Sequence, residues 1–302
     1  MCSYNAKQIF SNSTDKEQIV PNILPPLTTL LDDIRREADG FSGHVGLAAR
    51  RVEGKESIRF NADDIFSTAS VIKLVVLVEY LAQVATGELL STSPITLQPE
   101  KLVEGSGVLK DLQPGARITL HDLATLSITI SDNTASNMLI DAVGGLARIN
   151  TRLRDLGMAR TVMGRPFVFD SPVDNTGSPA DFLHLLLALA QGQVVSPTVS
   201  GQVLDLMGRQ QFMTYIPRYL PYHPFATEYG LPQPLTIANK VGMLRGTVND
   251  AALITTPDYR YGLVIFTRDC TDNRPDPDNE AALLVARLSQ RVYAYFEAQA
   301  AS

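Results

Sequence analysis

The chain has 302 residues, enough for one large domain or two lobes around a sizeable hydrophobic core. Hydrophobic residues make up 45% and charged residues 19%, a balance typical of globular proteins and not of disordered ones. A net charge of −6 argues against nucleic acid or an anionic membrane as the main partner, and the two cysteines, Cys2 and Cys270, are too few for a disulfide framework.

The amino-terminal residues 1–24 form a polar tail. They lack the basic stretch and apolar core of a secretory signal peptide. No run of the chain approaches the ~18 apolar residues of a membrane-spanning helix. We therefore expect no membrane span and a cytoplasmic protein, with a trimmed lipoprotein that begins at Cys2 as the alternative.

One helix and a β-hairpin follow the polar tail. Residues 26–40 combine a helical spacing of apolar residues with a polar face. The segments GHVGLAARRV (43–52) and ESIRFNA (56–62) have the composition of strands, and the polar turn EGK joins them.

The chain from residue 68 to about 213 has mostly helical patterns. The helical segments are SVIKLVVLVEYLAQVATG, LHDLATLSITI, NTASNMLIDAVGG, LARINTRLRDLG and SPADFLHLLLALAQG. Three strands come next, LTIANKVGM, GTVNDAALITT and YGLVIFTRD, and then a long helix, NEAALLVARLSQRVYAYFEAQ.

These elements predict an α+β fold. An antiparallel sheet is built from both ends of the chain and flanked by terminal helices, with an all-helical lobe inserted between its strands. We expect a single domain over 25–302, with an α/β lobe at 25–66 and 225–302 and a helical lobe at 67–224. A cavity between the lobes is the expected place for a functional site.

The stretch STASVIKLVVLVEYL (67–81) places one lysine, Lys73, in an almost wholly apolar helix. In a helix that starts near Ser70, residues i and i+3 share a face, so Ser70 and Lys73 are neighbours. Burial lowers the pKa of an ammonium group, and a neutral amine beside a hydroxyl can take its proton. The pattern indicates an activated serine nucleophile; the structural alternative is a capping serine and a lysine that reaches solvent.

Two further stretches favour the functional interpretation. S-D-N (131–133) lies at the junction of two helical segments, and K-V-G (240–242) lies on a predicted strand beside the cavity. Each has a structural alternative, because Ser, Asp and Asn are common helix N-caps and a lysine on an edge strand protects against aggregation. The presence of all three stretches, in this order, indicates a catalytic site.

With these stretches the sequence resembles the class A β-lactamases and the wider family of penicillin-recognising serine enzymes. The resemblance covers roughly residues 40–295 and extends to DLATLSITISDNTASNMLID, RGTVNDAALI and NTGSPADF. The last of these predicts a helix start with Ser178 as N-cap, Pro179 at N1 and Asp181 at N3. The resemblance implies the β-lactamase/transpeptidase-like fold and a small-molecule substrate, a β-lactam or a peptide-like acyl donor.

The resemblance also implies a catalytic role for each matching residue. Ser70 matches the nucleophile that becomes acylated, and Lys73 matches its helix partner, a candidate base. Ser131 matches the hydroxyl that relays a proton to the leaving nitrogen. Lys240 matches the cation on the strand, whose charge helps to hold Lys73 neutral.

Substrate binding is implied in the same way. Asn133 matches the amide that orients the substrate's own amide side chain, and the backbone N–H groups of Ser70 and Met243 would form the oxyanion hole. Asp132 is expected to hold its own loop by local hydrogen bonds. The expected substrate-binding residues are Asn133, Val241, Gly242 and Met243.

The loop that carries the hydrolytic base in the family departs from the family pattern here. Class A enzymes have a glutamate in an E-x-x-L-N loop, which activates the water that hydrolyses the acyl-enzyme. The matching region, ARTVMGRPFVFDSPVDNTGSP (159–179), contains no glutamate, and its carboxylates, Asp170 and Asp174, fit the composition of turns. Deacylation is then slow or runs through Lys73 or Ser131.

The second departure concerns recognition of a substrate carboxylate. Val241 stands where the family carries Thr or Ser, and its side chain cannot donate a hydrogen bond. An arginine that assists in many members is absent from the following strand, where Val248 stands. Arg245, Arg268 and Arg274 are the candidates to replace it.

No metal or nucleotide chemistry is indicated. The histidines are scattered without metal-ligand spacing, and EGSGVL (104–109) resembles the family's small-residue loop at the rim of the site more than a phosphate loop. We expect no cofactor and no metal, and a monomer that binds a small molecule and no nucleic acid.

Two functions from different classes remain. The first is a serine hydrolase that acts on a β-lactam, a D-amino-acid peptide or a small ester. The second is a penicillin-binding sensor or trap that stays acylated, which the missing glutamate permits. The complete acylation set favours the hydrolase.

Overall fold

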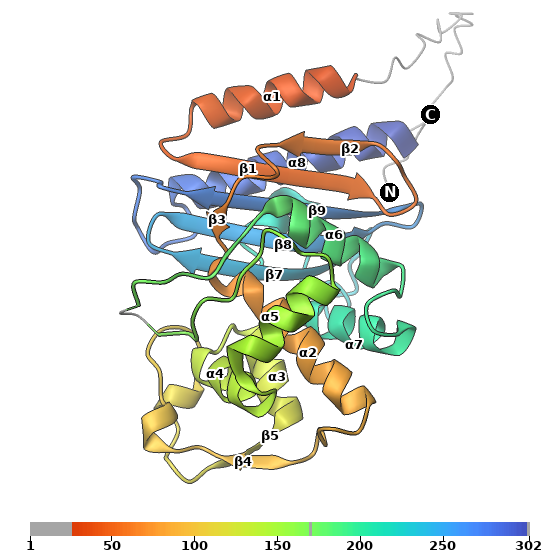
Figure 1. The fold of residues 1–302 in the computed structure, drawn as a ribbon. Helices are drawn as coiled ribbons and strands as arrows, with labels where there is room; N and C mark the ends of the chain where they lie inside the picture. Colours follow the sequence, from red (N-terminus) through yellow and green to blue (C-terminus); the bar gives the residue numbers. More distant parts are fainter. Residues whose placement is uncertain (1–25, 169–170, 301–302) are drawn as a thin grey trace, which may run out of the picture.

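The computed structural model describes residues 26–168 and 171–300 (Figure 1). The expected polar tail (1–24) lies outside these residues. In the described part of the chain, five strands form an antiparallel sheet in the order β2-β1-β9-β8-β7. The strands are β1 (His44–Arg51), β2 (Ser57–Phe60), β7 (Thr236–Leu244), β8 (Thr247–Thr255) and β9 (Arg260–Arg268). The predicted hairpin and the three later strands are confirmed, and β1 pairs with β9, so both ends of the chain build the sheet.

The terminal helices α1 (Leu27–Asp39) and α8 (Glu280–Ala300) cover one face of the sheet (Figure 1). Alternate residues of the strands, among them Ala252 and Ile254 of β8, pack against them in one buried cluster. Arg287 and Arg291 of α8 form ion pairs with Glu37 of α1, which join the two helices at the surface.

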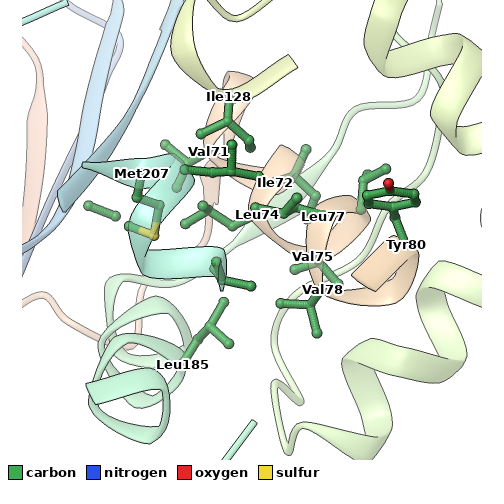
Figure 2. Close-up of a cluster of buried hydrophobic side chains, with 14 of the residues drawn as sticks. Val71, Ile72, Leu74, Val75, Leu77, Val78, Tyr80, Ile128, Leu185 and Met207 are labelled. Atoms are coloured by element: carbon green, nitrogen blue, oxygen red, sulfur yellow. The ribbon is translucent and has the colours of Figure 1, made fainter. Parts of the chain in front are cut away.

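The opposite face of the sheet carries the helical lobe. Its helices are α2 (Lys73–Ala85), α3 (Leu120–Thr129), α4 (Asn133–Ala142), α5 (Gly145–Asp155), α6 (Pro179–Ala190) and α7 (Pro197–Met207). Helix α6 lies on the sheet, and α2 runs through the middle of the lobe (Figure 1). Figure 2 shows Leu74, Val75 and Leu77 of α2 packed among side chains of α3, α6 and α7. Because α2 is buried on all sides, its sequence is apolar at most positions.

Short elements connect the two parts. The pair β3 (Phe66–Ser67) and β6 (Thr176–Gly177) joins the chain before α2 to the chain before α6, and β4 (Pro94–Thr96) pairs with β5 (Arg117–Thr119). The single turns are η1 (Ala69–Ile72), η2 (Pro99–Lys101), η3 (Leu109–Asp111) and η4 (Ile216–Tyr219). The expected helix start is present at α6, where Ser178 Oγ accepts from Asp181 N at 3.3 Å with Pro179 between them.

The helix predicted to start near Ser70 differs in detail. Ser70 lies in the 3₁₀ turn η1, and the α-helix α2 starts at Lys73. Ala69 has a φ of 45°, in the left-handed region, so the chain enters the turn from a non-helical conformation. Residues i and i+3 of a 3₁₀ turn also lie on one side, so the expected adjacency of Ser70 and Lys73 does not depend on the helix type.

We propose that residues 26–300 form one domain, because strand β8 contributes to the buried clusters on both faces. Ala252 and Ile254 pack with the terminal helices, and Ala251 and Leu253 pack with the helical lobe. Separating the two lobes would expose one face of a shared sheet.

Candidate active site

A cavity of about 340 Å³ lies where strand β7, the η1 turn, the α3–α4 junction and the loop before α6 meet. This volume suits a small organic ligand. The lining residues are Ala69, Ser70, Gly105, Ser106, Ser131, Asn133, Arg165, Phe167, Val168, Asp174, Asn175, Phe212, Tyr215, Val241, Met243 and Leu244. Five of the predicted site residues are in this set, and Lys73 and Lys240 lie fully buried beside it.

The turn that holds Ser70 is fixed from two sides. Thr68 N donates to the backbone oxygen of Asn175 at 2.8 Å, and Asn249 Nδ2 of β8 donates to the backbone oxygen of Ser67 at 2.7 Å. Ala69, immediately before Ser70, holds a left-handed conformation that a residue with a Cβ seldom adopts. The sheet and the loop before α6 together fix where the serine points.

Lys73 lies at the base of the cavity. Its Nζ donates to the Ser131 backbone oxygen (2.6 Å), Asn133 Oδ1 (2.9 Å) and Ser131 Oγ (3.2 Å). Among the hydrogen bonds of the described residues, none joins Nζ to the Ser70 hydroxyl. Burial, and then the charge of Lys240, lowers the pKa of Lys73 well below the ordinary lysine value, against a smaller opposite effect of Asp132. The buried site therefore favours the neutral amine of Lys73 more than water does.

Ser131 links the two buried lysines. Its Oγ is 3.2 Å from Lys73 Nζ and accepts a hydrogen bond from Lys240 Nζ at 3.1 Å. Its backbone is left-handed, with a φ of 58°, and its carbonyl also accepts from Ser106 Oγ at 2.7 Å. A strained backbone at this point is consistent with a hydroxyl held in a functional position.

Asp132 and Asn133 tie the α3–α4 junction to the loop 104–109. Asp132 Oδ1 caps α4 at Ala135 N (2.8 Å), while Oδ2 accepts from Val108 N (2.7 Å) and Leu109 N (2.9 Å). The carboxylate of Asp132 thus has the local hydrogen bonds that were expected of it. A side chain at Gly107, where φ is 108°, would collide with this carboxylate.

Strand β7 forms the wall opposite the α3–α4 junction. Gly242 contacts the η1 turn so closely that an added Cβ would lie 2.9 Å from Ser70 N, so β7 packs directly against the turn that holds Ser70. Lys240 Nζ also donates to the Val241 backbone oxygen at 2.8 Å. Burial lowers the pKa of Lys240 to about 7, with the charge of Asp250 acting in the opposite direction.

Val241 is 5% exposed and packs in the cluster on the terminal-helix face, while it also lines the cavity. Val248 packs in the same cluster and is not a lining residue. The candidate replacement arginines lie elsewhere. Arg245 is exposed in the β7–β8 turn, and Arg268 and Arg274 bind Asp269 and Asp272 at 2.7 Å each.

Phe167 lies in the loop before α6, the segment that carries the glutamate in the family pattern. Asn137 of α4 binds the backbone of Phe167 on both sides, with Oδ1 accepting from N at 2.8 Å and Nδ2 donating to O at 3.0 Å. The ring centroid lies 4.3 Å from Lys73 Nζ. Asp174 is paired with Arg165 at 3.1 Å, and Asp170 lies outside the described residues.

Sequence reasoning missed Phe167, Asn137 and Tyr215. Phe167 and Tyr215 line the cavity, and Asn137 positions Phe167. The α4 segment offered one signal, because Asn137 lies four residues after Asn133 and so shares its helix face. Tyr215 lies in an irregular segment after α7, where no periodicity points to a site.

Comparison with known proteins agrees with this geometry. Residues 29–296 match the family model described as the β-lactamase enzyme family. The chain belongs to this β-lactamase enzyme family. It is a serine hydrolase with the α+β fold that the resemblance implied, and within the described residues no group of His, Cys, Asp and Glu could hold a metal ion.

Relatives cover most of the chain. β-Lactamase OXY-2 of Klebsiella oxytoca is 26% identical over 81% of this chain and 82% of its own, and CTX-M-25 of Escherichia coli is 25% identical over 86% and 89%. The crystal structure of a β-lactamase from Sphaerobacter thermophilus has a TM-score of 0.79 and 29% identity, covering 90% of this chain and 98% of that one.

A protein named PBP-A is similar as well. Its structure has 31% identity and a TM-score of 0.78, covering 91% of this chain and 98% of that one. A point mutant of PBP-A, solved as an acyl-enzyme complex with penicillin G, has 31% identity and a TM-score of 0.79 over 91% and 99%. Across residues 26–168 and 171–300 of the present chain, no helix is long and apolar enough to cross a membrane.

Proposed function

We propose that the chain forms an acyl-enzyme on Ser70 with a β-lactam or a related amide or ester, and then hydrolyses it. The observation that supports this most is the position of the Ser131 hydroxyl between the two buried lysines, at 3.2 Å from Lys73 Nζ and 3.1 Å from Lys240 Nζ. A chain of proton donors and acceptors next to a cavity serves proton transfer, and stability alone does not require two buried lysines.

In the proposed acylation, Ser70 Oγ attacks the carbonyl carbon and its proton passes to the neutral amine of Lys73. The oxyanion that forms would accept hydrogen bonds from the backbone N–H groups of Ser70 and Met243. The close approach of Gly242 to the Ser70 amide supports this pairing. The bond from the carbonyl carbon to nitrogen or oxygen then breaks, and Ser131 delivers to the leaving atom the proton that Lys73 received.

Asn133 would orient an amide of the substrate. Its Nδ2 donates to the Glu104 backbone oxygen at 3.0 Å and its Oδ1 accepts from Lys73 at 2.9 Å, so the amide plane is fixed at the cavity wall. All groups in this mechanism come from one chain, which supports our proposal that the protein acts as a monomer.

Deacylation completes the reaction when water adds to the ester carbonyl and Ser70 leaves with a proton. Lys73 or Ser131 would activate this water, because Phe167 occupies the loop position beside Lys73 and the Asp174 carboxylate is paired with Arg165. The same observation favours a second candidate, a penicillin-binding sensor or trap that stays acylated. A D-amino-acid peptidase or esterase is the related alternative in which acylation proceeds on a linear substrate.

Intact-mass spectrometry of the protein mixed with a penicillin, followed over time, tests the proposal. We expect a Ser70 adduct that appears and then decays slowly, and an adduct that persists would establish the trap. The Ser70→Ala variant should form no adduct while retaining its fold, because this position makes no helix-cap hydrogen bond. Labelling of Ser70→Ala at the wild-type rate would remove Ser70 from the mechanism.

A further inference from the structure

We infer that the natural acyl donor of this site is an uncharged, largely apolar ester or amide, recognised beside β7 through a neutral hydrogen-bond acceptor and not through a carboxylate. This inference rests on the proposed acylation of Ser70. It concerns the part of the cavity beyond the reacting groups, between strand β7 and the segment that follows α7.

Apolar side chains form that part of the wall. Val241, Met243 and Leu244 come from β7, and Phe212 and Tyr215 come from the segment after α7. Met243 is 47% exposed, Phe212 42% and Leu244 39%, and all three line the same cavity. Exposed apolar surface gathered at the mouth of a cavity gains free energy when an apolar ligand covers it.

Charge in the wall is neutralised internally. Arg165 and Asp174 are the charged residues among the described lining set, and they pair with each other at 3.1 Å. Arg165 Nη1 also donates to the Val168 backbone oxygen at 2.7 Å, so its guanidinium is held by the loop. Lys240 is fully buried and donates to Ser131 and to the Val241 backbone. A carboxylate that entered this end of the cavity would lose water without gaining an unpaired cation from the described lining residues.

Tyr215 supplies the neutral donor. Its side chain is mostly buried, with the residue 7% exposed, and its hydroxyl donates to Met243 Sδ at 3.4 Å. A thioether sulfur is a weak acceptor, so the hydroxyl can exchange it for the carbonyl or ether oxygen of a substrate. Burial, and then the charge of Asp250, raises the pKa of Tyr215, which keeps the hydroxyl protonated as a donor.

The test compares two probes that differ in one charge. A chromogenic cephalosporin with its free carboxylate and the methyl ester of the same compound are each mixed with the full chain, and the rate of adduct formation is followed by intact-mass spectrometry. Each rate is divided by the rate of hydrolysis of that probe in hydroxide, which removes intrinsic reactivity. We expect the ester to acylate Ser70 roughly tenfold faster or more. Burying a carboxylate without a partner costs at least as much free energy as the loss of one hydrogen bond.

Variants at two positions test which residues cause the preference for the ester. Tyr215→Phe should lower the rate of the ester several-fold, because it removes the proposed hydrogen-bond donor. Val241→Thr adds a donor and should raise the rate of the free acid several-fold, whereas Val241→Ala, which opens space without a donor, should not favour the acid.

The outcomes separate the two proposals. A Ser70-dependent adduct that forms as fast from the free acid as from the ester overturns the substrate inference and leaves the acylation mechanism intact. The absence of any Ser70-dependent adduct from both probes overturns the proposed function and this inference with it. A rate of acylation by the ester that Tyr215→Phe does not lower removes Tyr215 as the recognition donor.

Discussion

The aromatic ring of Phe167 covers the side chain of Lys73, with Nζ 4.3 Å from the ring centroid. Asn137 fixes the backbone of Phe167 through both its N–H and its carbonyl, so the ring is held in this place. A ring can stabilise an ammonium ion by a cation–π contact, but it cannot accept a proton from water. The cavity wall beside Lys73 is therefore apolar at Phe167.

Replacing this ring with a carboxylate should speed deacylation. In Phe167→Glu, a base in the loop can take the proton of the hydrolytic water, and general-base catalysis contributes about 10²–10⁴ in rate. We expect the penicillin adduct to decay at least tenfold faster, measured by intact-mass spectrometry after excess penicillin is removed. The matched control is Phe167→Gln, which has similar size without a base; equal decay rates in the two variants would show that base catalysis is not what the loop lacks.

Turnover by the wild-type chain should show a burst. The proposed acylation has all its residues, whereas the loop before α6 offers no glutamate for the proposed deacylation. A chromogenic cephalosporin should therefore release about one equivalent of product per active site before a slow steady state. Stopped-flow absorbance measures both phases. Fast turnover of penicillins and cephalosporins without a burst would contradict the assignment of deacylation as the slow step.

Lys73→Met tests the proposed base. Methionine fills the buried space but has no amine, so acylation should slow by about 10²–10⁴ while thermal unfolding shows an intact fold. The rate of adduct formation with a penicillin gives the comparison. A rate within a few-fold of the wild type would make Lys73 a structural residue.

The pH dependence of acylation should report the interaction of the two lysines. Acylation needs neutral Lys73, so its rate rises with pH through the pKa of this group, which burial and the charge of Lys240 hold well below the ordinary value. Lys240→Met removes that charge, raises the pKa of Lys73 and should move the rising limb to higher pH. Lys55→Met, in the exposed β1–β2 turn, is the control. A limb that stays in place in Lys240→Met would show that the ammonium groups do not interact.

Asp250 behind β7 should make stability depend on pH. It is buried, it accepts from Asn239 Nδ2 at 3.0 Å and from Ile216 N at 3.1 Å, and burial raises its pKa to about 7. An unfolded aspartate titrates near ~3.9. The stability that Asp250 contributes by keeping its proton in the folded state is therefore fully present below that pH and is lost as pH rises through about 7.

Asp250→Asn abolishes this titration. Its free energy of unfolding, relative to wild type, should therefore rise between pH 4 and pH 7 in urea titrations. Asp258→Asn at the exposed β8–β9 turn should show no such trend. A difference between Asp250→Asn and wild type that is constant over this range would mean that Asp250 is ionised throughout.

Local patterns were sufficient to predict the main sheet and most helices, but not α7 or the short strands β3 to β6. The apolar alternation of 235–243 and 261–269 and the cap Ser178-Pro179 depend on residues close in the chain, and the structure confirms the strands and the helix start. Ser70 and Lys73 were found in the same way, since their spacing within one turn makes them neighbours whichever helix type forms.

The sequence by itself therefore determined the fold family, the proposed nucleophile with its lysine, and the two departures from the family, because each depends on contiguous residues. Only the tertiary structure decided what surrounds them. Ser131 Oγ meets Lys73 and Lys240 from 58 and 109 residues away. The burial of Lys73 and the nearby charge of Lys240, which together lower the pKa of Lys73, exist only after the sheet and the helical lobe pack together. The placement of Phe167 over Lys73 and of Tyr215 beside Met243 likewise depends on how irregular segments pack, and no periodicity in the chain encodes that.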